Sequence, residues 1–195
     1  MEIKTSVFIK SSITAKDCPS RELSEFAFIG RSNVGKSSLI NMLTQNKKLA
    51  KISGTPGKTL LINHFLINNS WFLVDLPGYG YAKTSKKEKE KIENIIVDYF
   101  TNRPSITLTF VLIDIRLNPQ KIDIEFMNWL NENNILFKII FTKTDKLNKN
   151  EKETKADNYI SKIINTTKLS PKFIVSSSKN KSGRKEILNK IQSLN

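Results

Sequence analysis

The stretch GRSNVGKSSLIN, which begins at Gly30, constrains the fold of this chain more than any other part of its sequence. Residues 30–37 match the pattern G-x-x-x-x-G-K-[ST], which binds phosphate when a strand precedes it and a helix follows it. The apolar run FAFI comes directly before Gly30, and a helical pattern covers residues 38–45. We therefore predict a strand, a glycine-framed turn and a helix that hold a polyphosphate. An ordinary glycine turn before a helix is the alternative.

Each residue type in this loop has a physical task. Backbone N–H groups of such a loop converge on phosphate oxygens at a helix N-terminus, where the helix dipole favours negative charge. Gly30 and Gly35 let the backbone approach the ligand closely. We expect Lys36 to neutralise the β- and γ-phosphates and the Ser37 hydroxyl to coordinate Mg²⁺.

Short β-branched or aromatic runs alternate with amphipathic stretches along most of the chain, which is typical of a parallel sheet covered by helices on both faces. The two runs that flank Asn68 and Asn69 are the exception, because a tight turn there predicts an antiparallel hairpin. We therefore predict an α/β domain with a six-stranded, mostly parallel sheet and one antiparallel hairpin strand. The run TSVFIKS at residues 5–11 is a candidate for an additional edge strand. The predicted strands cover residues 26–30, 60–67, 71–75, 107–114, 136–142 and 172–176, and the predicted helices cover residues 38–45, 86–101, 119–133, 149–166 and 183–194.

The length of 195 residues fits one domain with a sizeable core. Cys18 is the only cysteine, which excludes an internal disulfide and fits a reducing cytoplasm. No apolar run approaches the ~18 residues of a membrane-spanning helix, and the first residues lack the long apolar core of a signal peptide. We therefore expect a cytoplasmic, monomeric protein without a membrane partner.

The segment TKTD, at residues 142–145, ends one of the predicted strands. The carboxylate of Asp145 can accept hydrogen bonds from N1–H and from the 2-amino group of guanine, whereas adenine offers no such pair of donors. A mismatch that leaves a buried carboxylate unpaired is worth several orders of magnitude in discrimination. Lys143 can lay its methylene stem along the base and reach back toward the phosphate loop. The segment predicts guanine recognition, although four residues taken alone also fit a solvated turn.

Two further strand ends complete the predicted nucleotide site. DLPG, at residues 75–78, places Asp75 where it can hold Mg²⁺ through a water and Gly78 where its N–H can reach a γ-phosphate. VSS, at residues 175–177, follows the last strand, where the N–H of Ser176 or Ser177 can donate to guanine O6. Ligands of open α/β sheets bind at the carboxyl ends of the strands, so these segments are expected to meet.

Taken in order, GRSNVGKSSLIN, TPGKT, VDLPGYGYA, TKTD and VSSSKN resemble the successive motifs of the EngB family of bacterial GTPases, also called YihA or YsxC. The resemblance runs from about residue 24 to the C-terminus. It implies an EngB-type G domain with a Ras-like phosphate-loop fold over residues 24–195, and residues 1–23 are expected to form an N-terminal extension. It also implies a guanine-nucleotide switch, with a role in assembling the large ribosomal subunit and a link to cell division and septation.

The resemblance carries a set of expected GTP- and GDP-binding residues to this chain. They are Gly30, Arg31, Ser32, Asn33, Val34, Gly35, Lys36, Ser37, Gly57, Lys58, Thr59, Leu60, Leu61, Asp75, Leu76, Pro77, Gly78, Thr142, Lys143, Thr144, Asp145, Val175, Ser176 and Ser177. The expected Mg²⁺ ligands are Ser37, Thr59 and, through a water, Asp75. Thr142 departs from the N-K-x-D of most GTPases and matches the T-K-x-D of this family. Because one hydroxyl cannot replace both functions of an amide, we expect weaker nucleotide affinity.

Thr59 and Tyr79 bear on switching and on hydrolysis. Thr59 is positioned to reach Mg²⁺ when a γ-phosphate is present, so we expect residues 46–59 to form a mobile loop that the triphosphate orders. Tyr79 follows DLPG, where Ras-like enzymes use Gln to orient water, so hydrolysis should be slow. Asn33 stands where, in certain GTPases with this substitution, a loop Asn binds K⁺ that stabilises the transferred phosphoryl group. The alternative is that Asn33 only fills the turn. Asn33 and Lys36 are the candidate catalytic residues.

The charge of the chain indicates an anionic partner. Its 32 Lys and Arg residues against 18 Asp and Glu give a net charge of +14. We expect lysines near the nucleotide to contact the large ribosomal subunit or its RNA, presented or withdrawn with nucleotide state. The codon bias of an AT-rich genome is the alternative source of this charge. The lysines in question are Lys47, Lys48, Lys51, Lys58, Lys83, Lys86 and Lys87.

Three rival functions use the same phosphate loop. A metabolic kinase or ATPase is opposed by TKTD and by the lack of a lid-like arginine cluster. A GTPase of tRNA modification or membrane traffic would normally need a further domain or a lipid anchor. An interaction module with a vestigial loop is opposed by the intact Lys36, Ser37 and Asp75. His64, the only histidine, is interpreted as a structural or surface residue rather than a catalytic one.

Overall fold

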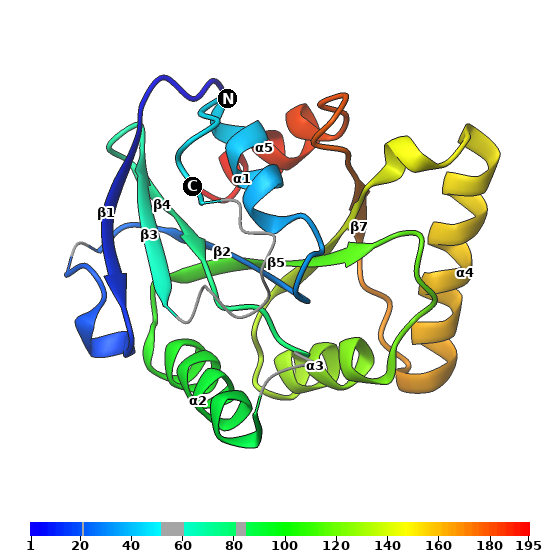
Figure 1. Ribbon diagram of the computed structural model, residues 1–195, viewed down its shortest axis with the longest axis horizontal. Helices are drawn as coiled ribbons and strands as arrows, with labels where there is room; N and C mark the ends of the chain where they lie inside the picture. Colours follow the sequence, from blue (N-terminus) through cyan, green and yellow to red (C-terminus); the bar gives the residue numbers. More distant parts are fainter. Residues whose placement is uncertain (21, 52–60, 81–84) are drawn as a thin grey trace.

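The computed structural model describes residues 1–20, 22–51, 61–80 and 85–195, which form a single sheet flanked by helices on both faces (Figure 1). The sheet has seven strands in the order β1-β3-β4-β2-β5-β6-β7. The strands are β1 (Ser6–Ser12), β2 (Glu25–Gly30), β3 (Ile62–Ile67), β4 (Trp71–Asp75), β5 (Ile106–Asp114), β6 (Phe137–Thr142) and β7 (Phe173–Val175). The α-helices are α1 (Lys36–Thr44), α2 (Lys86–Asn102), α3 (Lys121–Glu132), α4 (Lys149–Thr167) and α5 (Arg184–Gln192), and short 3₁₀ turns cover η1 (Ala15–Asp17) and η2 (Thr144–Lys146).

Strand directions follow the predicted pattern, with one addition. Strands β4, β2, β5, β6 and β7 are parallel to one another, and β3 pairs antiparallel with β4. Asn68 and Asn69, in the turn between β3 and β4, have φ values of 49° and 55°. Asn tolerates this left-handed conformation, which hairpin turns of type I′ require. The sheet has seven strands instead of the expected six, because the N-terminal candidate strand β1 pairs antiparallel with β3 and forms the edge of the sheet.

Helices bury a separate apolar layer on each face of the sheet. The α2, α3 and α4 side chains Ile92, Met127 and Ile163 pack on one face, whereas Leu39 of α1 and Ile187 of α5 pack on the other. Strand β2 is buried along its whole length because both of its faces are covered. None of the described helices is long and apolar enough to cross a membrane.

A buried polar cluster lies where β2 begins, at the end of the strand opposite the phosphate loop. Glu25 accepts hydrogen bonds from Tyr99 at 2.7 Å and from Arg103 Nε at 2.8 Å, and His64 Nε2 lies 3.4 Å from its carboxylate. Burial raises the pKa of Glu25, but contacts with His64, Arg103 and Tyr99 lower it by more than burial raises it. The pKa of Glu25 is therefore about 2. His64 is fully buried and meets the Phe72 ring edge to face, so it is structural, and the alternative of a surface residue is wrong.

Candidate nucleotide-binding site

The phosphate loop joins β2 to α1 in a backbone conformation that needs its glycines. A Cβ atom at Gly30 would lie 2.7 Å from the carbonyl oxygen of Leu112 on β5, which is too close for any other residue. Gly35 is the N-cap of α1 and has a φ of 103°, a region that side chains strongly disfavour. Asn33 has a φ of 63°, which Asn adopts more readily than most residues, so turn geometry alone accounts for an Asn there.

Lys36 and Asp75 meet at the N-terminus of α1. The Lys36 ammonium forms an ion pair with the Asp75 carboxylate, and both side chains are largely buried, with 12% and 5% exposed. Lys36 begins α1, and Asp75 ends β4, so the contact brings the two phosphate-side segments together. Ser37 follows Lys36 in the first turn of the helix. A hydroxyl, a carboxylate and an ammonium therefore share one small region at the carboxyl edge of the sheet.

This donor set fits Mg²⁺. Hydroxyl and carboxylate oxygens are hard ligands, and Mg²⁺ commonly uses one or two protein oxygens together with water and substrate phosphates. In the described ranges no group of three or more His, Cys, Asp or Glu side chains is arranged to hold a metal. Thr59, the third expected ligand, lies outside the described residues, as do Gly57, Lys58 and Leu60.

The base-side segment TKTD is tied directly to the phosphate loop. Thr142 Oγ1 lies 2.7 Å from the carbonyl oxygen of Val34 and 3.2 Å from that of Ile113, so its hydroxyl donates to the loop. Lys143 Nζ donates to the carbonyl oxygen of Asn33 at 2.7 Å and pairs with Asp114 Oδ2 at 3.0 Å. The hydroxyl of Thr142 therefore links the base-side segment to the phosphate-side segment through a hydrogen bond.

Asp114 was not identified by the sequence analysis. It ends β5 and also accepts hydrogen bonds from Arg116 Nε at 2.9 Å and Nη2 at 2.7 Å. Burial raises its pKa, but the bonds from Arg116 and Lys143 outweigh that effect and hold its pKa at about 2. Asp114 is thus an anion that fixes the Lys143 ammonium. Its position at the carboxyl end of a central parallel strand was the signal that could have revealed it.

Asp145 is held by a side chain of the last strand-end segment. Ser177 Oγ donates to Asp145 Oδ1 at 2.6 Å, and this bond is the main cause that lowers the pKa of Asp145. The N–H of Thr144 donates to the carbonyl of Ser176 at 3.4 Å, which connects the two segments through their backbones. The carboxylate is therefore ionised and oriented by its partner.

The backbone of the VSS segment corrects one expectation. The N–H of Ser176 donates to the carbonyl oxygen of Phe141 at 2.7 Å, and the N–H of Ser177 donates to the carbonyl oxygen of Ser182 at 3.3 Å. Neither group is free to donate to guanine O6, contrary to the sequence analysis. The N–H of Ser178 forms no backbone hydrogen bond with any residue that the structure describes. Ser178 is the next candidate, and sequence reasoning missed it because the three consecutive serines did not reveal which one was free.

Tyr79 lies next to the phosphate loop, and its side chain is almost fully buried. Its N–H donates to the carbonyl of Gly30 at 3.3 Å, and its ring stacks on Phe126 of α3 with centroids 4.6 Å apart. Burial and the neighbouring Asp123 carboxylate raise its pKa well above the ordinary value. A buried phenol that remains protonated in this position is part of the core beneath α3.

The remaining predicted residues lie around the same loop and strand ends, and several of them are buried. Leu76 and Thr144 are buried, at 0% and 2% exposure, so their contribution to any ligand is through the backbone. The other segments lie at the carboxyl edge of the sheet: Arg31, Ser32 and Val34 in the phosphate loop, Leu61 before β3, Pro77 and Gly78 after β4, and Val175 at the end of β7. The described part of the 46–59 segment is anchored, because Asn41 hydrogen-bonds to Lys47 and Ala50. Residues 52–59, the rest of the segment predicted to be mobile, lie outside the described residues.

Known proteins resemble this chain over its whole length. Residues 25–143 match a family described as 50S ribosome-binding GTPases. The probable GTP-binding protein EngB of Phocaeicola vulgatus is 56% identical over 100% of this chain and 98% of its own length. The protein of the same name from Flavobacterium johnsoniae is 54% identical over 100% of this chain and 93% of its own length.

Solved structures support the same fold. The crystal structure of a probable GTP-binding protein EngB superimposes with a TM-score of 0.66 and 27% identity, covering 88% of this chain and 98% of that one. Era in complex with MgGDPNP and nucleotides 1506–1542 of 16S ribosomal RNA gives a TM-score of 0.69 at 20% identity, over 88% of this chain and 56% of that one. At that identity the likeness is one of fold. Because the relatives share more than half of their residues with this chain from end to end, it belongs to the EngB proteins of the 50S ribosome-binding GTPase family and is a GTP-binding protein with GTPase function.

Proposed function

We propose that this GTPase is a Mg²⁺-dependent switch that assists assembly of the large ribosomal subunit in the cytoplasm and thereby supports cell division and septation. The observation that supports the nucleotide site of this proposal is the tethering of the base-side and phosphate-side segments: Thr142 and Lys143 bind the loop, and Ser177 orients Asp145. The ribosomal role is supported by the description of the matched family. We expect the chain to act as a monomer.

The phosphate end of the site uses Lys36, Ser37 and Asp75. Lys36 and the N-terminus of α1 supply positive charge for the β- and γ-phosphates. Ser37, and Asp75 through a water, would hold Mg²⁺, which when bound neutralises charge on the phosphates. Asp75 and the phosphates then compete for the ammonium of Lys36, so nucleotide binding separates this ion pair.

The base end of the site selects guanine through Asp145. Its oriented carboxylate accepts from the two guanine donors, while the Ser178 N–H, which has no backbone partner among the described residues, would donate to O6 and oppose the amino group of adenine. The Lys143 stem lies 3.8 Å from the position of a Cβ at Gly35, so it runs along the loop and bounds the base pocket.

Hydrolysis is slow in this proposal because Tyr79 stands in the position of the water-orienting Gln. Tyr79 is buried against Phe126 and lacks an amide. Asn33 is exposed at the loop, where its side chain can serve as a K⁺ ligand that supports charge on the transferring phosphoryl group. The alternative, in which Asn33 only adopts the turn conformation, predicts no effect of K⁺. Thr59 would couple the γ-phosphate to the loop before β3.

Exposed lysines near the nucleotide provide the contact with ribosomal RNA. Lys86 and Lys87 begin α2 and are exposed, as are Lys48 and Lys51 in the loop after α1. Lys58 and Lys83 lie outside the described residues. Contacts with RNA phosphates release counterions, so affinity should decrease steeply as salt increases.

Co-sedimentation with purified large ribosomal subunits at several salt concentrations tests the ribosomal role. Replacing Lys83, Lys86 and Lys87 by Ala should weaken binding and lower the salt slope by roughly one unit for each RNA phosphate that is no longer neutralised. The matched control replaces three exposed lysines of α4, namely Lys149, Lys155 and Lys162. GDP affinity should be unchanged in both variants. Equal binding by both triple variants would refute the proposed surface, and absence of binding by the wild-type chain would refute the ribosomal role.

A further inference from the structure

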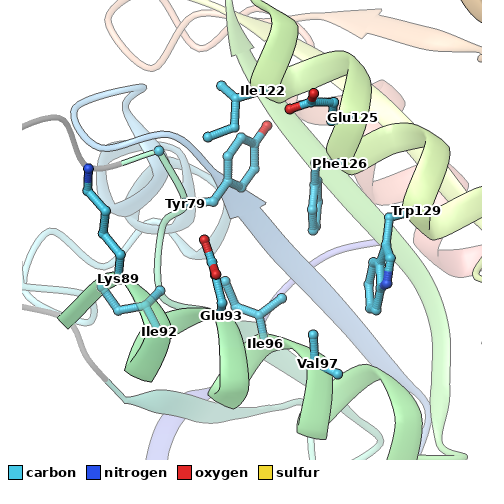
Figure 2. Close-up of a pocket in the computed structure, with 11 residues that line it drawn as sticks. Tyr79, Lys89, Ile92, Glu93, Ile96, Val97, Ile122, Glu125, Phe126 and Trp129 are labelled. Atoms are coloured by element: carbon cyan, nitrogen blue, oxygen red, sulfur yellow. The ribbon is translucent and has the colours of Figure 1, made fainter. Parts of the chain in front are cut away.

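A groove between α2 and α3 begins at the residue that follows DLPG. It encloses about 500 Å³ and is lined mainly by apolar and aromatic side chains (Figure 2). Helix α2 contributes Ile92, Ile96 and Val97, and α3 contributes Ile122, Phe126 and Trp129. Val97 and Ile122 are 45% and 38% exposed, which makes this one of the places where large apolar side chains face solvent. An apolar hollow on a protein surface commonly marks a binding site.

The wall of the groove on the α3 side is a preformed aromatic stack. Tyr79 and Phe126 stack with centroids 4.6 Å apart, and Phe126 and Trp129 are nearly parallel at 6.1 Å and 19°. Phe100 of α2 meets Trp129 edge to face at 5.9 Å, which helps to fix the Trp129 ring. Rings fixed in this way lose little conformational entropy when they bind a partner, as at the centres of protein interfaces.

The charges that line the groove differ from those of the rest of the chain. The protein carries a net charge of +14, but the groove is lined by two carboxylates, Glu93 and Glu125, and one ammonium, Lys89. Glu125 pairs with the exposed Lys121 at 3.5 Å, whereas Glu93 forms no ion pair with any residue in the described ranges. Figure 2 shows Glu93 and Glu125 on opposite sides of the opening, Glu93 from α2 and Glu125 from α3.

These features distinguish between classes of partner. Nucleic acid is disfavoured, because its phosphates would face two carboxylates with only Lys89 to contact. A second copy of the chain is disfavoured by its net positive charge. A polypeptide segment that combines apolar side chains with arginine fits best: its apolar groups would fill the hollow, and a guanidinium would lie over Trp129 and pair with Glu93, the carboxylate that has no ion pair among the described residues.

We propose that the α2–α3 groove is a docking site for a basic, apolar segment of a protein in the large ribosomal subunit. The identity of this partner rests on the proposed ribosomal function, whereas the chemistry of the segment rests on the groove alone. Tyr79, the first residue of the aromatic wall, is bonded through its N–H to Gly30 of the phosphate loop at 3.3 Å. Docking is therefore linked to the nucleotide site.

A peptide measurement tests the chemistry without the ribosome. The probe is a short amphipathic peptide with leucine and arginine at helical spacing, and its control carries glutamate in place of arginine. Trp129 lines the groove, and the only other tryptophan, Trp71, is fully buried in β4, so intrinsic fluorescence reports occupation. We expect saturable binding of the arginine peptide alone. Absence of binding, or equal binding of both peptides, would overturn the proposal.

Charge reversal locates the peptide. Glu93→Lys with Glu125→Lys should weaken binding of the arginine peptide about tenfold, because both carboxylates become repulsive. The control, Glu90→Lys with Glu132→Lys, makes the same change in net charge on the same two helices at exposed positions that do not line the groove. Equal losses in the two variants would show a general effect of charge and refute the assignment.

Photo-crosslinking identifies the ribosomal occupant. A benzophenone amino acid is placed at Val97 on the groove rim and, as a control, at Ile164 on α4, which is 39% exposed. With large subunits bound, position 97 should crosslink to a basic protein segment and position 164 should not. Crosslinks to RNA or to a second copy, or equal crosslinking from both positions, would refute the docking proposal. Subunits that do not bind at all, while the arginine peptide does, would refute the ribosomal function and its partner but leave the groove chemistry supported.

Discussion

Replacing Ser177 by Ala removes the hydrogen bond that holds the Asp145 carboxylate. The bond is 2.6 Å long and involves an ionised acceptor. Hydrogen bonds to charged groups contribute about 1.5–3 kcal/mol when water is excluded. Asp145 is partly exposed without a ligand, so water replaces much of this bond there and the fold should lose little stability. When guanine covers the carboxylate, the loss should appear as about 1–2 kcal/mol, which is roughly a five- to thirtyfold weaker GDP affinity.

Isothermal titration calorimetry with GDP measures this loss, and two variants serve as controls. Ser178→Ala keeps its backbone N–H and should bind GDP like the wild type, while Ser177→Thr restores a hydroxyl and should recover most of the affinity. The pKa of Asp145 is lowered mainly by Ser177, so in Ser177→Ala it rises toward the ordinary value. GDP binding by Ser177→Ala should then decline at a higher pH than binding by the wild type. A folded Ser177→Ala variant with GDP affinity within about twofold of the wild type would refute the assignment.

Four further predictions address other parts of the molecule. Asp145→Asn should weaken GDP binding by at least ~2 kcal/mol and improve binding of xanthine nucleotides, and unchanged GDP affinity in calorimetry would contradict it. Thr59→Ala should reduce affinity for a non-hydrolysable GTP analogue more than for GDP, and equal losses would exclude a switch role. Hydrolysis should be faster in K⁺ than in Na⁺, and an Asn33→Ala variant that kept this advantage would support the turn-filling alternative. The pKa of Glu25 is lowered from 4.5 to about 2, so its ionisation stabilises the fold above pH 4.5 and this contribution is lost as pH decreases through about 2. The difference in unfolding free energy between the wild type and Glu25→Gln should therefore decrease by about 3 kcal/mol on acidification, which urea denaturation at pH 5 and pH 2 would measure.

The sequence predicted the order and type of the main elements because both are encoded locally. Alternating and continuous apolar runs identified each strand of the sheet, and glycine and asparagine identified the turns. The predicted strand 60–67 begins at Ile62 in the structure, and helix 38–45 begins at Lys36. Helix α1 begins two residues earlier than predicted, since Gly35 forms its cap through backbone conformation and without a side-chain hydrogen bond.

The candidate site was predicted less completely, because its side chains interact across long separations in the chain. Asp114 fixes Lys143, and Ser177 fixes Asp145, yet neither pair has a spacing that a linear motif would reveal. The orientation of the Tyr79 side chain could not be predicted from the sequence either, since its burial depends on Phe126 of α3. Strand ends indicated where functional groups gather, whereas hydrogen-bond partners required three-dimensional positions.

The antiparallel pairing of β1 has a consequence for how the chain folds during synthesis. β1 leaves the ribosome well before β3, its partner among the described strands, as the 52-residue separation of the Ser11–Asn63 hydrogen bond shows. Val7, Phe8 and Ile9 must therefore wait without a partner while β2, the phosphate loop and α1 are made. A bulky fusion placed before β1 would hinder this strand while it is still unpaired. Such a fusion would change the time needed to complete the sheet edge rather than the stability of the finished domain.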